Sequence, residues 1–204
     1  MARAKAPRRA RRGGTPEDRL IEAALALAER QGWRRSGLAE IAAEAGVSVA
    51  EAYALHRGKR AILRAFQRRI DQAALAGTSS GDSARERLFD MLMRRFEALK
   101  PHKAAVRAIL RDSIGHPAAI FGVISVERSM RWMLEGAGVS TGGCAGRLLV
   151  HLTTGLYLSV LRVFLGDDSE DLGRTMAALD RGLRQGEQLC RYLPGRARPS
   201  ARAS

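Results

Sequence analysis

The sequence predicts an all-α protein of about nine helices, arranged as an N-terminal three-helix domain and a larger C-terminal helical domain. Apolar residues recur at steps of three and four through most of the chain. No segment alternates apolar and polar residues for long enough to predict a strand. Serine or threonine followed three residues later by an acid marks several helix starts, and glycine marks several helix ends.

The formal net charge is +14, and most of it lies at the two ends of the chain. Residues 1–14 hold six Lys and Arg and no acid, whereas the long stretch 15–190 is nearly balanced. We expect residues 1–14 to form a disordered basic arm and 193–204 a basic tail. Such arms suit a polyanion such as DNA, where arginines neutralise phosphates or enter a narrow minor groove, or they keep the protein in solution.

Other classes of protein are disfavoured by composition. The most apolar stretch, Leu148–Leu165, is interrupted by polar residues, so we expect a buried helix and no stable membrane insertion. Two cysteines and four scattered histidines form no metal-binding pattern, and a reducing cytoplasm is expected. No phosphate loop or nucleophile motif is present, and Asp167 and Asp168 have the position of helix caps. We therefore expect neither an enzyme nor a cofactor or metal.

The first helix is expected to begin at Pro16, with Thr15 as its N-cap and Asp18 closing a capping box. Gly32 ends this helix, and Trp33 is expected to pack against the helices that follow. The stripe that faces inward consists of Leu20, Ile21, Ala24, Leu25, Leu27 and Ala28.

Residues 38–63 predict two short helices joined by a tight turn, followed at once by another helix that begins at Lys59. Gly46 can end the first helix because it enters the left-handed conformation at little steric cost. Ser48 can cap the second, and Glu51 completes the S-x-x-E capping box. This arrangement is either an ordinary corner of two helices or a helix-turn-helix, whose second helix can lie in the DNA major groove.

The pattern A-x-x-x-G-V-S-x-x-x-x-Y ends at Tyr53 and is followed six residues later by Lys59. With the preceding Gly32-Trp33 helix terminus, it resembles the TetR family of one-component transcriptional regulators, from Leu20 to about Leu63. The resemblance implies a homodimer that binds palindromic operator DNA through the helix-turn-helix. On the same ground we expect a repressor rather than an activator.

The resemblance also implies which residues contact DNA. The recognition helix, Val49 to about Leu55, has no Lys or Arg, so its reading of bases depends on Ser48, Val49 and Ala50. Glu51 either caps its own helix, which we favour, or accepts from a cytosine amino group. The hydroxyl of Tyr53 and the ammonium of Lys59 are expected on phosphates. The expected DNA-binding residues are Arg34, Arg35, Ser36, Gly37, Ser48, Val49, Ala50, Glu51, Tyr53, His56 and Lys59.

Two of these positions depart from the family pattern. Gly37 lacks the hydroxyl that is usual before the second helix, and Leu55-His56 replaces the usual end of the recognition helix. The polar, glycine-rich run 77–81 is the expected boundary between a DNA-binding domain over 15–77, including a linking fourth helix, and a helical domain over 82–192.

The C-terminal domain is expected to bind a small hydrophobic or amphipathic effector. Its apolar helix over 144–166 and its last helix, from Glu170 to about Tyr192, are expected to form the dimer interface. His151 is polar within an apolar helix and needs a partner or a ligand. An aromatic side chain or Met at helical spacing more often belongs to a plain core than to a ligand site. The candidate ligand-binding residues are Phe96, Trp132, Met133, His151, Tyr157 and Phe164.

A second resemblance gives a different function. The stretches RLFDMLMRRFEALKPHKAAVRAIL and SMRWMLEGAGV resemble the C-terminal part of TetR-fold lipid-binding proteins of ubiquinone biosynthesis. That resemblance implies a lipid-binding accessory protein without specific DNA binding, which the absence of basic residues on the recognition helix also fits.

Overall fold

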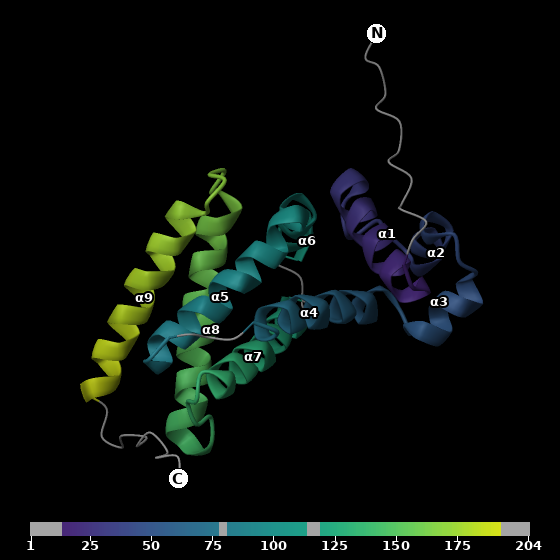
Figure 1. Ribbon diagram of the computed structural model, residues 1–204. Coiled ribbons are helices and arrows are strands. Elements are labelled where there is room, and N and C mark those ends of the chain that lie inside the picture. Colours follow the sequence, from purple (N-terminus) through teal and green to yellow (C-terminus); the bar gives the residue numbers. More distant parts are fainter. Residues whose placement is uncertain (1–13, 78–80, 114–118, 193–204) are drawn as a thin grey trace. The chain divides into compact units, whose positions relative to one another are not determined.

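The computed structural model describes residues 14–77, 81–113 and 119–192, and within them regular structure is helical throughout (Figure 1). The all-α prediction is confirmed. The basic arm and tail lie outside the described residues. The helices are α1 Pro16–Gln31, α2 Leu38–Ala45, α3 Val49–Leu55, α4 Lys59–Leu75, α5 Ala84–Leu99, the 3-10 helix η1 Lys100–His102, α6 Lys103–Ser113, α7 Ala119–Gly136, α8 Gly143–Leu165 and α9 Gly173–Tyr192.

The chain folds into two compact units whose division differs from the predicted one. The first unit combines the chain up to Arg68 with the segment that begins at His102, and the second holds the remainder. Helix α6 therefore belongs with the N-terminal helices and packs on α1. The predicted C-terminal domain over 82–192 includes the residues of α6. Composition alone cannot show against which of two apolar surfaces a helix packs.

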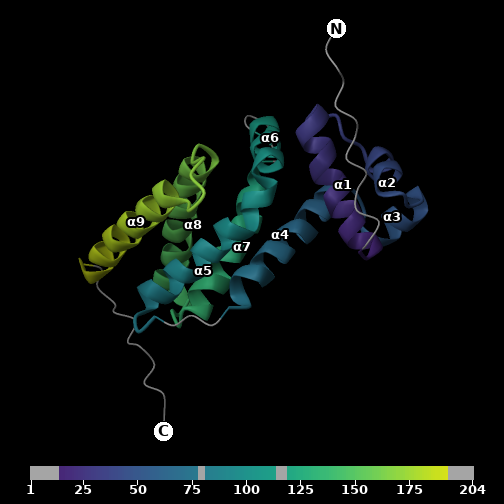
Figure 2. The ribbon, with the colours of Figure 1, turned by 45° about the horizontal axis from the view of Figure 1, so that its top comes forward.

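The first unit is built on α1, which α2, α3 and α6 all contact (Figure 2). Its N-terminus has the predicted capping box, in which Thr15 and Asp18 each accept from the other's backbone N–H. Burying an apolar helix face against its neighbours is the main favourable term for helices of this length. The buried side chains on α1 and α2 include Leu20, Ile21, Ala24, Ala28, Ile41 and Ala42.

The second unit has an aromatic core between α5 and α8. The ring of Phe96 stacks on Tyr157 with centroids 5.3 Å apart, and it also contacts Phe164 at 5.2 Å. All three side chains are buried. Helices α8 and α9 pack side by side in both views (Figures 1 and 2). Of the helices described, only α8 has the length and apolar composition of a membrane span, and the core helix of a water-soluble protein meets the same criterion.

Helix α9 begins later than the sequence predicts, at Gly173 rather than at Glu170. Asp167 closes the loop that precedes it. Its buried carboxylate accepts from the N–H and hydroxyl of Thr175, at 2.8 and 2.7 Å, and from the hydroxyl of Ser169. The predicted capping role of Asp167 is thus observed, and the loop that it closes delays α9.

Replacing Asp167 with Ala should lower the free energy of unfolding by about 2 kcal/mol, because the Thr175 donors lose a charged acceptor in a buried place. Burial opposes ionisation, but the hydrogen bonds from Ser169 and Thr175 outweigh it and hold the pKa of Asp167 well below its usual value. A depressed folded-state pKa adds stability above the unfolded pKa of about 4 and loses it as the pH falls further.

Urea unfolding of both proteins from pH 7 to pH 3 provides the measurement. The stability difference should stay constant down to about pH 5 and shrink at lower pH. The exposed Glu170→Ala is the control and should follow the wild-type profile. Parallel profiles for wild type and Asp167→Ala at all pH values would refute this role for the carboxylate.

Candidate nucleic-acid interface

The joint between α2 and α3 has the geometry of a helix-turn-helix. Gly46 adopts the left-handed conformation, with φ 67° and ψ 36°, and the N–H of Val47 donates to the Ala42 carbonyl at 3.0 Å. Ser48 then caps α3, because its hydroxyl oxygen accepts from the Glu51 N–H at 3.1 Å. Local sequence alone fixes this joint, since every contact in it lies within five residues.

Helix α3 leaves most of its surface open. Ala52 is buried against the unit, while Val49 and Tyr53 are 50% and 58% exposed. The exposed set is Val49, Ala50, Glu51, Tyr53, Ala54 and Leu55. This surface offers methyl groups, one phenolic hydroxyl and one carboxylate, so it suits apolar contact with thymine methyls and a hydroxyl contact to phosphate rather than cationic reading of guanine.

The capping role expected for the Glu51 side chain is not observed. Only the Ser48 half of the capping box forms, and the Glu51 side chain is exposed. The exposed carboxylate of Glu51 repels phosphates, and it can accept a hydrogen bond from an amino group such as that of cytosine.

The turn between α1 and α2 carries two exposed arginines, Arg34 and Arg35. The neighbouring Ser36 is only 1% exposed, and its hydroxyl donates to the Gly32 carbonyl at 3.0 Å. Ser36 was expected to contact DNA, but this hydrogen bond turns its side chain inward. The two arginines are therefore the cations that this turn presents.

Gly37 occupies the N-cap of α2 without a side-chain cap. Its backbone N–H donates to the Glu40 carboxylate at 2.9 Å, which satisfies one donor at the helix start. Gly37 was expected among the DNA-binding residues, although it lacks the usual hydroxyl. Its backbone N–H is already hydrogen-bonded to the Glu40 carboxylate, so it is not free to donate to a phosphate.

Lys59 does not have the free ammonium that was expected on a phosphate. Its Nζ donates to the carbonyl oxygens of Trp33, Ser36 and Arg34, at 2.8, 2.9 and 3.3 Å. The ammonium has three protons, and three carbonyls accept them. Nζ also lies 5.0 Å from the centre of the Trp33 ring, and burial, followed by repulsion from Arg60, lowers the pKa of Lys59.

His56 also points inward, contrary to the prediction that it contacts DNA. Its ring is 6% exposed, and its Nε2 lies 3.4 Å from a Glu17 carboxylate oxygen. Burial lowers the pKa of His56 despite the nearby carboxylate. His56 is therefore buried at the end of α3, beside Glu17 of α1.

The candidate ligand-binding residues do not lie together. Trp132 is 54% exposed, and His151 is exposed, with its Nδ1 2.7 Å from the Arg147 carbonyl and its Nε2 3.8 Å from a Glu127 carboxylate oxygen. Neither side chain belongs to an interior site, because each lies on the outward side of its helix. The other four candidates, Phe96, Met133, Tyr157 and Phe164, are buried in the core of the second unit.

A buried ionic cluster in the second unit was missed by sequence analysis. Arg95 is 2% exposed, forms an ion pair with Asp71 and donates from Nε to the Tyr157 hydroxyl at 3.1 Å. The hydroxyl of Ser129 donates to the second Asp71 oxygen at 2.7 Å. In the sequence Arg95 looks like a solvated helix residue, and its partners lie 24 to 62 residues away, so no local pattern could reveal the cluster.

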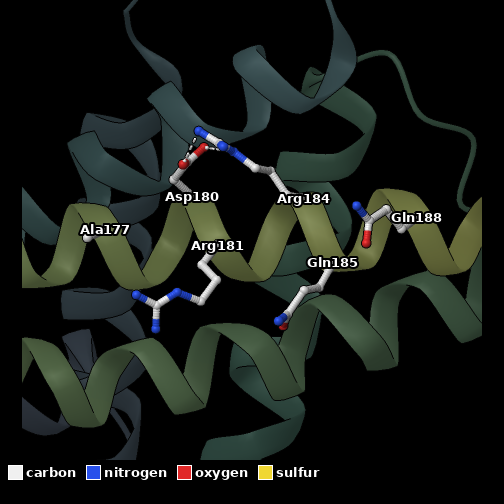
Figure 3. Close-up of a pocket in the computed structure, with 6 residues that line it drawn as sticks. All are labelled: Ala177, Asp180, Arg181, Arg184, Gln185 and Gln188. Carbon is white, nitrogen blue, oxygen red and sulfur yellow. Dashed lines mark hydrogen bonds and ion pairs between the residues drawn. The ribbon is translucent and has the colours of Figure 1, made fainter.

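A shallow depression of about 330 Å³ runs along α9 (Figure 3). Arg181 and Gln185 point from α9 towards the neighbouring helix, while Asp180 pairs with Arg184 on the other side (Figure 3). Asp180 also accepts from Arg85 of α5 at 3.2 Å. The depression is open to solvent and five of its six lining residues are charged or amides, whereas a hydrophobic ligand requires an enclosed apolar site. Within the described part of the chain, no three His, Cys, Asp or Glu side chains group as metal ligands.

Comparison with known proteins agrees with this geometry. Residues 20–66 match the family model described as bacterial regulatory proteins, tetR family. The matched segment includes all of α2 and α3 and ends within α4. The predicted resemblance of the N-terminal domain is therefore confirmed. A search of curated proteins gave no match.

Two crystal structures illustrate the similarity of fold. A TetR transcriptional regulator from Nitrosomonas europaea ATCC 19718 superposes with a TM-score of 0.67 at 24% identity, over 84% of this chain and 98% of that chain. A TetR transcriptional regulator from Rhodococcus sp. RHA1 gives a TM-score of 0.56 at 23% identity, over 83% and 94%. The chain thus has the fold of TetR-family transcriptional regulators.

Replacing Gly46 with Ala should lower the free energy of unfolding by about 1–2 kcal/mol, because a Cβ is strained in the left-handed conformation. A Cβ at Gly46 would meet no atom within 4 Å, so the backbone strain is the only penalty. The matched control is Gly186→Ala within α9, which also has open space but ordinary helical backbone. It should stabilise by about 0.5–1 kcal/mol. Denaturant unfolding followed by circular dichroism measures both, and equal effects would contradict the assigned geometry.

Proposed function

We propose that this chain, whose residues 20–66 form a TetR-family N-terminal domain, is a cytoplasmic transcriptional repressor that binds palindromic operator DNA as a homodimer. A small hydrophobic or amphipathic effector releases it. The observation that carries the proposal is the open surface of α3, which follows the helix-turn-helix joint in the same unit as the exposed Arg34 and Arg35.

The residues of that surface fall into two groups, one suited to phosphates and one suited to base edges. Arg34 and Arg35 supply affinity that is independent of sequence, because guanidinium groups pair with phosphates wherever they meet them. Val49 and Ala50 supply apolar contact with thymine methyls, and Tyr53 fixes the register through a phosphate. An operator read in this way is rich in A·T pairs at the centre of each half-site.

Apolar side chains exposed on α8 and α9 support the homodimer. Leu148 and Leu152 lie one turn apart on α8 and are 44% and 45% exposed, and Met176 on α9 is 43% exposed. A second copy that packs against these helices would bury them in a bundle of four helices. A two-fold axis then presents two copies of α3, and half-sites one helical turn of DNA apart match such symmetry.

The effector proposal rests on the aromatic core of the second unit. Phe96, Tyr157 and Phe164 are packed against one another, so an apolar effector would have to part them. Regulation of this kind requires that the effector bind one arrangement of the dimer more tightly than the other. The polar groups next to this core are the buried Arg95, which donates to Tyr157, and its half-buried partner Asp71.

A lipid-binding accessory role is the second candidate. Its supporting observations are that α3 exposes no cation and that α7 exposes Val123, Ile124 and Trp132. Gel shifts with the DNA upstream of the gene, together with mass spectrometry of extracts from the purified protein, distinguish the two roles. Weak, sequence-independent DNA binding together with a co-purified lipid would favour the accessory role.

Replacing Arg34 and Arg35 with Ala should weaken binding to the upstream DNA by at least tenfold at moderate salt and reduce the slope of log K against log salt by about 2. Each phosphate contact that is lost leaves about one more counterion bound to the DNA, and this lowers the salt dependence of binding. Fluorescence anisotropy at several salt concentrations measures this change. Arg174→Ala, an exposed arginine of α9 in the other unit, should leave the slope unchanged. An unchanged slope for the double variant would exclude the turn from the interface.

Replacing Leu152 with Glu should convert the homodimer into monomers, because a carboxylate cannot be buried in an apolar interface without a partner. Analytical ultracentrifugation measures the mass in solution. Leu75→Glu on α4 is the matched control, since Leu75 is 41% exposed, and it should leave the dimer intact. A dimer that survives Leu152→Glu would place the interface elsewhere.

A further inference from the structure

The turn between α1 and α2 is held by two helices that lie far from it in the sequence. Lys59, at the start of α4, binds the carbonyl oxygens of Trp33, Arg34 and Ser36. Asp112, near the end of α6, accepts from the Arg34 N–H at 3.2 Å. All of these residues belong to the first unit. The turn that carries the exposed arginines is thus held at its backbone carbonyls by Lys59 and at one backbone N–H by Asp112.

Both clamping groups bind the backbone of this turn, and the second carboxylate oxygen of Asp112 lies 3.6 Å from the Nε of Arg111. The three carbonyls that Lys59 binds leave its ammonium no proton for a phosphate. The hydrogen bond from Arg34 holds the pKa of Asp112 below its usual value, so Asp112 remains an acceptor at neutral pH.

Gly32 allows the close approach of Asp112. A Cβ at Gly32 would lie 2.8 Å from a carboxylate oxygen of Asp112, and the φ of +90° at Gly32 also disfavours any side chain. The glycine that ends α1 therefore leaves room for the carboxylate of α6 to reach the Arg34 N–H.

We propose that Asp112 and Lys59 are positioning residues for DNA binding: they fix the course of the turn, and with it Arg34, Arg35 and the start of α2, without touching DNA. This inference rests on the proposed DNA-binding function. In this proposal α6 contributes to DNA binding through the carboxylate of Asp112. Lys59 stabilises the turn instead of contacting a phosphate.

Charge alone predicts the opposite result for Asp112. An acid beside a DNA-binding surface repels phosphates, so its removal should strengthen binding if the carboxylate acted only through its charge. Under the clamp proposal its removal frees the turn and weakens binding. The sign of the change therefore separates the two explanations.

The experiment compares Asp112→Asn and Asp112→Ala with wild type, using the upstream DNA that the wild type binds and an unrelated duplex of equal length. We expect a graded loss of affinity for the upstream DNA, with Ala losing about tenfold and Asn less, because the amide keeps one acceptor. The control Glu29→Gln removes the same charge from an exposed site on α1 and should bind as well as wild type or better. Circular dichroism at the assay temperature confirms that each variant is folded.

Lys59 is tested by the salt dependence of binding. Lys59→Met should weaken binding while leaving the slope of log K against log salt at the wild-type value, whereas loss of a phosphate contact would reduce that slope by about 1. Hydrogen exchange at the Arg34 N–H should be faster in Asp112→Ala than in wild type.

Three results would overturn the inference. Asp112→Ala could bind DNA as tightly as Glu29→Gln, Lys59→Met could reduce the salt slope by one, or Arg34 exchange could be unchanged. Each leaves the proposed function intact if the wild type still prefers the upstream DNA. A wild type that binds both duplexes equally overturns the proposed function, and the inference with it.

Discussion

The course of the turn between α1 and α2 depends on one ammonium group. Lys59 donates to three carbonyl oxygens of the turn between α1 and α2, which would otherwise need water or other partners at a tight bend. Removing the ammonium of Lys59 from water costs free energy and lowers its pKa, and the three hydrogen bonds offset that cost. Lys59 therefore stabilises the fold, and Arg34 and Arg35 are the cations that this turn exposes.

The second unit uses a buried cation in a similar way. Arg95 pairs with Asp71 of α4 and donates to Tyr157 of α8, so one guanidinium joins three helices. Apolar packing alone allows helices to slide over one another, because it has little directional preference, whereas an ion pair with hydrogen bonds selects one register. The cluster thus ties the end of α4 that belongs to the second unit to α5 and α8.

Helix α8 combines two surfaces that the sequence does not distinguish. Val150, Tyr157 and Phe164 are buried within the unit, while Leu148 and Leu152 are exposed. A helix that is apolar on all faces is stable in water only when each face is buried against another element. The helices of this chain bury one face of α8 and leave the other exposed. The remaining apolar face is the physical reason to expect a second copy there.

Local interactions determined by the sequence alone include the caps at Thr15 and Ser48, the left-handed Gly46, and the bounds of α1 to α3. Each depends on residues within one helical turn, so the pattern of residue types contains the information. The N-terminal family resemblance rests on the same short-range pattern, and it was confirmed for that reason.

Only the tertiary structure decided which polar groups face inward. Ser36, His56 and Lys59 were expected at DNA and instead bind the backbone or lie buried beside α1, while His151 was expected inside and is exposed. Asp112 and Arg34 meet across 78 residues, and α6 joins the first unit rather than the second. Helical periodicity shows which residues share a face, but what covers that face depends on contacts between distant segments, and no local pattern records them.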